Sequence, residues 1–191
     1  IFVPGNISAA HLQSALMPFS KLGLSPALLP VLADNNYTRP YPIQQEVIPA
    51  ILKNKDILGI APTGSGKTAS YVLPILTQLQ HSTAGKNRHI NVLVLVPTRE
   101  LAMQVREVFH IFNAPLPQKV KTLAVFGGVS VNPQMMALHG VNVLIATPGR
   151  LLELVEANAV HLSDIHTLVL DEADKMLNLG FKEEMDRIFS L

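Results

Sequence analysis

Short apolar segments rich in β-branched residues alternate with longer amphipathic stretches along this chain. Strands buried on both faces of a parallel sheet show continuous apolar runs of this kind, because helices cover both faces. We therefore expect one α/β domain built around a mostly parallel sheet. The expected strands cover residues 56–60, 91–96, 120–126, 141–146 and 166–171.

Helical periodicity fills the stretches between these strands. Ser25-Pro26 is a typical helix start, and Pro74 is expected to bend the helix that contains it. Apolar residues after Thr98 recur at helical spacing, which indicates a face packed in the core rather than a binding face. The expected helices cover residues 25–34, 43–53, 67–79, 98–112, 131–138, 149–158 and 173 to the end.

Polar and glycine-rich segments follow the expected strands. In parallel α/β sheets, ligands bind at the carboxyl ends of the strands. The segments at these positions are 61–68, 97–99, 127–128, 147–150 and 171–174. This coincidence is the first indication of where the chain binds its ligands.

The segment APTGSGKT, residues 61–68, has the pattern of a phosphate-binding loop, except that Ala61 stands where a glycine is usual. Glycines here let backbone amides converge on an anion where a helix begins. Lys67 can reach the outer phosphates, and the Thr68 hydroxyl can bind Mg²⁺. The alternative is an ordinary glycine-rich turn. The expected nucleotide-binding residues in this loop are Thr63, Gly64, Ser65, Gly66, Lys67 and Thr68.

Residues 168–174, LVLDEAD, end an apolar strand with acidic side chains. A nucleoside triphosphatase needs an acid to hold Mg²⁺ and a base to activate water. Asp171 could hold the metal ion, largely through water, and Glu172 is the candidate general base. Together with Lys67 they form the expected catalytic group. The alternative is a helix N-terminus rich in acids, which is common without any catalytic role.

The composition excludes several classes of protein. The chain is 48% hydrophobic and 15% charged, which argues against disorder, and no apolar run reaches the roughly 20 residues that span a bilayer. It has no cysteine, and its seven histidines show no metal-ligand spacing. A net charge of +1 says little about partners. We expect a cytoplasmic protein without membrane contact.

Residues 171–174 spell DEAD, and PTREL, GG and TPGR begin at residues 97, 127 and 147, in this order after the phosphate loop. With these motifs the chain closely resembles the amino-terminal RecA-like domain of DEAD-box RNA helicases, from about Phe19 to its end. The resemblance implies a three-layer α/β/α fold of the P-loop nucleoside triphosphatase class, with ATP and Mg²⁺ as cofactors. The stretch FSKLGLSPALL resembles bacterial RhlE-type members.

The resemblance also assigns an adenine site. Gln44, in Pro42-Ile43-Gln44, matches the residue that reads adenine, and its amide has the donor and acceptor for a bidentate bond. Phe19 matches the aromatic residue that packs on the base, although a plain core phenylalanine is the alternative. The chain departs from the family at Asn36, where glycine is usual, and at Tyr41, where a small hydroxyl residue is usual. Asn tolerates left-handed geometry, whereas Tyr41 puts one contact of the adenine site in question.

PTREL, GG and TPGR are similar to the family's RNA-binding motifs. Their hydroxyls, backbone amides and arginines suit phosphate contacts, and none reads a base edge, so binding independent of RNA sequence is expected. The 2′-hydroxyl would help to distinguish RNA from DNA. For Arg99 the alternative is a structural salt bridge. The expected RNA-binding residues are Pro97, Thr98, Arg99, Gly127, Gly128, Thr147, Pro148, Gly149 and Arg150.

The expected organisation is a leader or mobile tail over residues 1–16 and a RecA-like domain over residues 17–191. The family's Ser-Ala-Thr motif would follow, and its strand lies between the phosphate-loop strand and the DEAD strand. We expect residues outside this sequence, or a second copy, to occupy that position. The second RecA-like domain, which carries an arginine finger and half of the RNA site, is the expected partner.

The function expected from these features is the ATP-binding half of an RNA-dependent ATPase that unwinds short RNA duplexes or remodels ribonucleoprotein. The fragment alone should be weakly active or inactive. The main alternative is a non-catalytic, nucleotide-regulated RNA clamp, which would not need Glu172 as a base. A small-molecule P-loop kinase fits the loop but not the other motifs, and a DNA helicase of related architecture is a further alternative.

Overall fold

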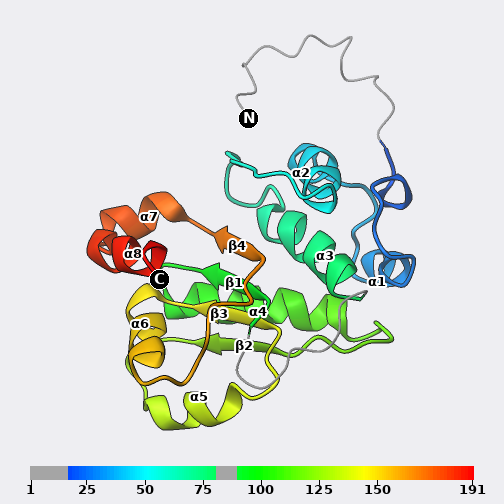
Figure 1. Ribbon diagram of the computed structural model, residues 1–191. Helices are drawn as coiled ribbons and strands as arrows, with labels where there is room; N and C mark the ends of the chain where they lie inside the picture. Colours follow the sequence, from blue (N-terminus) through cyan, green and yellow to red (C-terminus); the bar gives the residue numbers. More distant parts are fainter. Residues whose placement is uncertain (1–16, 81–89) are drawn as a thin grey trace. The chain divides into compact units, whose positions relative to one another are not determined.

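The protein is described by a computed structural model, which falls into two compact units (Figure 1). We call them the amino-terminal unit and the sheet unit. The described residues are 17–80 and 90–191. Among the described residues, the amino-terminal unit takes in 17–80 and 111–118, and the sheet unit takes in 90–110 and 119–191.

Some predictions fall outside the described residues. These are the leader over residues 1–16 and the histidines His11, His81 and His89. In the part of the chain that the structure describes, no helix is both long and apolar enough to cross a membrane. Across the same residues, no three histidine or carboxylate side chains gather into a group that could hold a metal ion.

A parallel sheet of four strands forms the centre of the sheet unit in the described chain (Figure 1). The strand order is β2-β3-β1-β4. Each strand lies inside a segment predicted from its apolar run, so these four strand predictions and the parallel α/β class are confirmed. The strands are β1 (Val92–Leu95), β2 (Thr122–Val125), β3 (Val143–Ala146) and β4 (Thr167–Leu170).

The inner strands β1 and β3 are buried along their whole length. The register places Leu93 of β1 between Leu144 of β3 and Leu168 of β4. Burial alternates along β4, where Leu168 is 45% and Leu170 is 39% exposed. The strand order makes β4 an edge of the described sheet, and one of its faces exposes apolar side chains.

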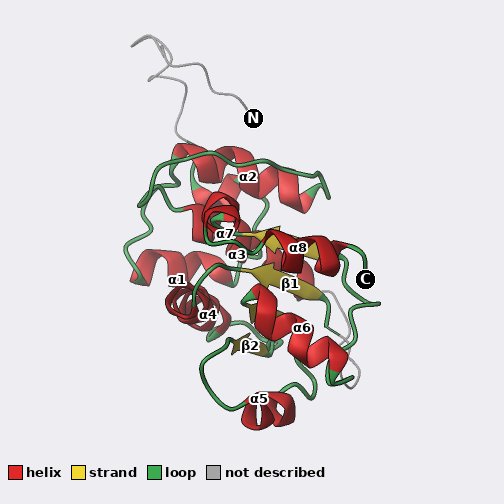
Figure 2. Ribbon diagram, turned by 90° about the vertical axis from the view of Figure 1, so that its left-hand side faces the viewer, coloured by secondary structure: helices red, strands yellow, loops and turns green. Residues whose placement is uncertain are grey.

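Helices flank this sheet. Helices α6 and α8 lie side by side (Figure 2), and Arg187 of α8 donates a hydrogen bond to Glu156 of α6. Their buried side chains, such as Leu151 and Ile188, belong to one core cluster with Leu93 and Leu144. The helices that begin in this unit are α4 (Arg99–Asn113), α5 (Val131–Ala137), α6 (Pro148–Glu156), α7 (Ala173–Asn178) and α8 (Lys182–Phe189).

The amino-terminal unit is helical in its described part. Helices α2 and α3 pack together, and the Nε2 of Gln78 donates to the carbonyl of Ile51 at 3.0 Å. The helix predicted from Ser25 begins three residues later, since Ser25 lies before a turn and donates its N–H to the Thr77 hydroxyl. The elements are a 3-10 helix (Phe19–Lys21), α1 (Leu28–Asp34), α2 (Pro42–Leu52) and α3 (Lys67–Leu79).

The strand predicted over residues 56–60 is wrong. This segment has no regular secondary structure, and Leu58 and Ile60 are 70% and 76% exposed. An apolar run becomes a strand only where a neighbouring strand completes its ladder of hydrogen bonds. The four described strands pair only among themselves, so the local apolar pattern is not enough to place this segment in the sheet.

Candidate functional site

The predicted phosphate loop lies in the amino-terminal unit and leads into α3. Gly64 and Gly66 have φ angles of 78° and 80°, in the left-handed region that favours glycine. Gly66 is the N-cap of α3. The N–H groups of Gly64, Gly66 and Lys67 donate to no acceptor among the described residues. Amide donors of this kind at a helix N-terminus are an arrangement that binds phosphate.

The polar side chains of the loop lie at the start of α3 and around it. The Nζ of Lys67 donates to the Ala61 carbonyl, so the side chain folds back over its own loop. The Thr68 hydroxyl is partly buried and has no hydrogen bond among the described residues. Ser65 donates its hydroxyl to Pro62 at 2.7 Å, and Thr63 is exposed. Their roles as phosphate and Mg²⁺ ligands stay predictions.

Gln44 connects the start of α2 with the phosphate loop. Its side chain is fully buried; Oε1 accepts the N–H of Tyr41 at 2.9 Å, and Nε2 donates to the Gly66 carbonyl at 3.1 Å. A glutamine amide has one further lone pair and one further N–H. The structure shows that Gln44 links the start of α2 to the phosphate loop. Its role in reading adenine stays a prediction.

Phe19 lies in aromatic packing within the amino-terminal unit. It is 5% exposed and meets Tyr37 edge to face, with ring centroids 6.4 Å apart, and Tyr37 meets Phe112 at 5.3 Å. Burial, with a smaller contribution from Tyr41, raises the pKa of Tyr37. This packing matches the alternative of a core phenylalanine, and contact with a base stays a prediction. Asn36 has a φ of 63°, so it does adopt the left-handed geometry expected where the family has glycine.

Tyr41 is the N-cap of α2, and its side chain makes no capping hydrogen bond. The residue is 51% exposed, and its Cδ2 would lie 3.0 Å from a Cβ atom built on Gly66. The N–H of Ile43, at the second helical position, has no acceptor among the described residues. The family's small hydroxyl residue would supply an acceptor at this point, and the tyrosine instead places a ring beside the phosphate loop.

Replacing Tyr41 with threonine should stabilise the protein relative to the valine variant. The threonine hydroxyl can accept the N–H of Ile43, whereas valine has the same shape without the hydroxyl. A side-chain N-cap contributes about 0.5–2 kcal/mol, so urea unfolding should give Tyr41→Thr a free energy of unfolding higher than that of Tyr41→Val by this amount. Equal free energies of unfolding for the two variants would show that no cap forms.

The DEAD segment follows β4 in the sheet unit. Asp171 is 8% exposed and donates its N–H to the Leu95 carbonyl of β1 at 3.0 Å. Glu172 is the N-cap of α7 with φ 53°, a left-handed conformation that is uncommon outside glycine and typical of functional sites. Its carboxylate pairs with Lys175 at 2.8 Å, and the hydrogen bond and charge of Glu172 raise the pKa of Lys175. The side chain of Glu172 remains 24% exposed.

PTREL follows β1. Pro97 is buried, and the Thr98 hydroxyl accepts the N–H of Leu101 at 3.2 Å, which caps α4. The Arg99 side chain is 56% exposed and pairs with Glu100 at 3.3 Å. Surface ion pairs of this kind are weak, so Arg99 is free to exchange this partner for a phosphate. The salt-bridge alternative for Arg99 describes the contact observed, and its contact with RNA stays a prediction.

TPGR follows β3. Thr147 is the N-cap of α6 and makes no side-chain cap bond, while Pro148 is buried. Gly149 is half-buried in the first turn of the helix. Arg150 is only 5% exposed, which was not expected for an arginine predicted to contribute charge to an RNA surface.

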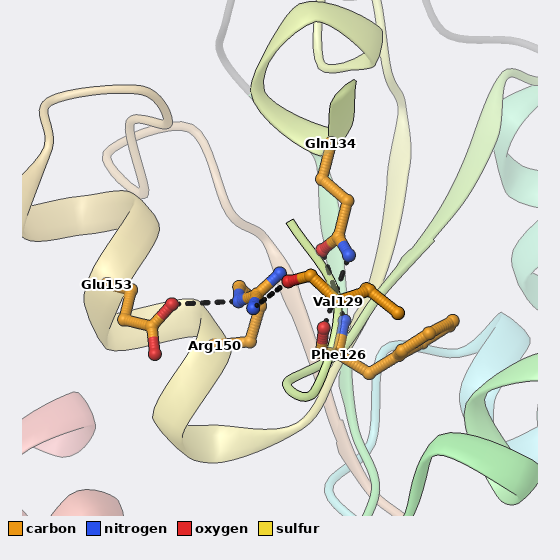
Figure 3. A network of polar contacts seen from close by, with 5 residues as sticks. All are labelled: Phe126, Val129, Gln134, Arg150 and Glu153. Atoms are coloured by element: carbon orange, nitrogen blue, oxygen red, sulfur yellow. Dashed lines mark hydrogen bonds and ion pairs between the residues drawn. The ribbon is translucent and has the colours of Figure 1, made fainter. Parts of the chain in front are cut away.

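Gly127 and Gly128 form an exposed loop after β2, and Gly128 has a φ of 80°. Arg150 contacts the residue that follows this loop, where its Nη2 donates to the Val129 carbonyl at 2.8 Å (Figure 3). Before the loop, Gln134 of α5 is hydrogen-bonded to the backbone of Phe126. Gln134 was missed by sequence reasoning, because a single glutamine in a helical pattern gives no signal of a contact eight residues away.

The sheet unit brings four predicted segments to one edge. Residues 97–99, 127–128, 147–150 and 171–174 follow β1, β2, β3 and β4, and all four strands are parallel. The carboxyl ends of parallel strands meet at the same edge of a sheet. The structure therefore gathers the predicted RNA-binding segments and the DEAD segment there. The phosphate loop belongs to the other unit.

The family of this chain follows from these motifs and from their similarity to known proteins. Residues 41–191 match the model of the DEAD/DEAH box helicase family. This chain belongs to that family. Its fold is that of the amino-terminal RecA-like domain of DEAD-box helicases, as the motifs predicted. The likeness to RhlE-type members stays a prediction.

Curated DEAD-box relatives are similar over most of this chain. The ATP-dependent RNA helicase DeaD of Buchnera aphidicola is 44% identical over 175 residues, which are 91% of this chain and 28% of that protein. The DEAD-box ATP-dependent RNA helicase CshA of Streptococcus pneumoniae is 43% identical over 91% of this chain and 32% of that protein. The chain thus spans about a third of the length of these relatives.

Solved DEAD-box structures have the same fold. A DEAD box protein of Methanococcus jannaschii matches with a TM-score of 0.82 and 34% identity, over 91% of this chain and 46% of that one. The yeast DEAD-box splicing factor Prp28 matches with a TM-score of 0.84 and 33% identity, over 92% of this chain and 42% of that one.

Proposed function

We propose that this chain is the ATP-binding part of an RNA-dependent ATPase that unwinds short RNA duplexes or remodels ribonucleoprotein. The observation that carries the proposal is the common edge of the sheet, where three RNA-type motifs and the DEAD segment follow neighbouring parallel strands. Both curated relatives described above are ATP-dependent RNA helicases by name. The domain would cover residues 17–191.

ATP is a fitting ligand for the phosphate loop. The left-handed glycines and the amides without acceptors suit a polyphosphate chain, and Lys67 adds a positive charge. Gln44 and Phe19 would serve the adenine, and Thr68 and Asp171 would hold Mg²⁺, largely through water. When bound, Mg²⁺ neutralises negative charge on the phosphates. Glu172 would take a proton from the attacking water.

RNA would be held through its backbone. Thr98 and Thr147 offer hydroxyls, helix starts and Gly127-Gly128 offer amides, and Arg99 offers an exposed charge. Contacts of this kind fix a strand in place without reading its bases, so we propose binding that does not depend on sequence. The 2′-hydroxyl is the group by which RNA would be preferred to DNA.

Further parts of the protein would complete the activity. A second RecA-like domain would supply an arginine finger and half of the RNA site, so the 191-residue chain alone should hydrolyse ATP poorly. Strand β4 is an edge with exposed leucines, which supports pairing with a strand from outside this sequence or from a second copy. A dimer in ultracentrifugation would favour the second copy, and a monomer would exclude it. The cytoplasmic location stays a prediction.

The test of this function is ATP hydrolysis by the intact protein, with ATP or GTP and with RNA or single-stranded DNA of the same sequence. We expect RNA to raise the rate of ATP hydrolysis, and neither GTP nor DNA to substitute fully. Nucleotide-dependent RNA binding without any turnover would favour the clamp alternative. RNA-stimulated turnover by the 191-residue chain near that of the intact protein would contradict the need for a second domain.

A further inference from the structure

The exposed loop Gly127-Gly128 is held by side chains at both of its ends (Figure 3). Before the loop, the N–H of Phe126 donates to Oε1 of Gln134, and Nε2 of Gln134 donates to the Phe126 carbonyl, both at 3.2 Å. After the loop, the Val129 carbonyl accepts from Nη2 of Arg150 at 2.8 Å. Among the described residues, no side chain is hydrogen-bonded to the two glycines between these anchors.

Gln134 acts as a substitute for a neighbouring strand. Strand β2 ends at Val125, so the backbone groups of Phe126 are outside the sheet ladder. A side-chain amide presents one donor and one acceptor, the same pair that a peptide group presents. By satisfying both groups of Phe126, Gln134 prolongs the order of the strand by one residue, up to the first glycine.

Arg150 holds the other end with little contact to solvent. Its Nε lies 2.9 Å from Oε2 of Glu153, an ion pair rather than a well-aligned hydrogen bond, and Nη1 has no hydrogen-bond partner among the described residues. The side chain is 5% exposed. A guanidinium buried in this way and donating to a backbone carbonyl is placed to fix a loop, because its planar fork has a defined direction.

We propose that Gln134 and Arg150 are positioning residues that hold the Gly127-Gly128 loop in the one conformation that presents its amides to an RNA phosphate. The proposal rests on the proposed function, since it concerns the RNA site of that function. Glycines have the largest conformational freedom of any residue, so without anchors an RNA strand would have to order this loop on binding. Loss of an anchor should therefore weaken RNA binding without a change in the chemical step.

The first experiment replaces Gln134 with methionine in the intact protein. Methionine has a similar length and packs similarly but offers neither a strong donor nor a strong acceptor. We expect the KM for RNA to rise about 5- to 30-fold, the equivalent of ordering one backbone residue, with kcat at saturating RNA and ATP affinity without RNA little changed. Without RNA, hydrogen exchange should become faster at the amides of residues 126–129.

Two further variants sharpen this experiment. Met136→Ala is the matched control, because Met136 lies on the same helix and is 83% exposed; it should leave the KM for RNA unchanged. Gln134→Glu keeps an acceptor for the N–H of Phe126 but places negative charge against the Phe126 carbonyl. Its KM for RNA should therefore rise as it does in Gln134→Met.

The salt dependence of RNA binding separates positioning by Arg150 from direct contact. A side chain that neutralises a phosphate contributes about one unit to the slope of log K against log salt. We expect Arg150→Met to weaken RNA binding and leave this slope unchanged. A slope that falls by about one unit would overturn the positioning role of Arg150.

The remaining outcomes also decide the proposal. If wild-type protein binds RNA and Gln134→Met binds it equally well, the positioning role falls while the proposed function stands. Faster exchange at residues 126–129 with an unchanged KM for RNA leads to the same conclusion. If the wild-type protein binds no RNA, the proposed function falls and this role falls with it.

Discussion

Replacing Glu172 with glutamine in the intact protein should lower the rate of ATP hydrolysis about 10²–10⁴-fold, the usual contribution of a general base. Glutamine has nearly the same shape and can keep the left-handed backbone at this position, where φ is 53°. It cannot take a proton from water at neutral pH. ATP and RNA binding should therefore survive, and steady-state hydrolysis measured beside equilibrium binding of both ligands would separate the effects.

The control for this variant concerns Lys175. Glu172→Gln also weakens the ion pair with Lys175, which spans 2.8 Å. Lys175→Met removes the same ion pair and keeps the carboxylate, and since the lysine side chain is 57% exposed the rate should change less than about fivefold. If Lys175→Met were as slow as Glu172→Gln, the ion pair and not the base would be responsible. Unchanged hydrolysis in Glu172→Gln would assign the base to another residue.

Replacing Gly66 with alanine should weaken ATP binding more than replacing Gly64. Both glycines have left-handed φ angles, 80° and 78°, so alanine pays a similar conformational cost of roughly 1–2 kcal/mol at either position. Their surroundings differ. A Cβ atom on Gly66 would lie 2.4 Å from Nε2 of Gln44 and 3.0 Å from the ring of Tyr41, whereas one on Gly64 would meet nothing within 4 Å.

The difference between the two variants measures this crowding. Overpacking of a well-packed site costs about 1–3 kcal/mol, so Gly66→Ala should bind ATP roughly 10- to 100-fold more weakly than Gly64→Ala. Titration of the intact proteins with a fluorescent ATP analogue gives the affinities, and thermal unfolding shows whether the fold survives. Equal losses of affinity would mean that Gln44 and Tyr41 move aside without cost.

Local patterns predicted the parts of the fold that depend on local chemistry. Residues 92–96 are an apolar run rich in valine and are buried, and the structure places β1 there. Residues 56–60 are also apolar, but a strand needs a neighbour, and the neighbour is a non-local feature that a five-residue run does not encode. The four motifs that share one edge of the sheet were predictable because parallel strands all point the same way.

The sequence was less informative about burial and about distant contacts within the site. Arg150 was predicted as a charge for RNA, and only the folded chain reveals that its guanidinium is buried against the Val129 carbonyl. The bond from Gln44 to Gly66 joins residues 22 positions apart. The contact of Gln134 with Phe126 depends on how α5 packs against the end of β2. No periodicity or spacing rule carries this information.

The buried amide of Gln44 couples the conformation at the start of α2 to the conformation of the phosphate loop. Its oxygen accepts from Tyr41 and its nitrogen donates to Gly66, so a shift of either partner moves the same rigid group. Thermodynamic linkage is reciprocal. If binding near Tyr41 raises the affinity of the phosphate loop for its ligand by some factor, binding at the loop raises the affinity near Tyr41 by the same factor. If Gln44 reads the base and the loop binds the phosphates, as proposed, selectivity for the base and affinity for the phosphates would be coupled, and a change made to tune one of them would alter the other.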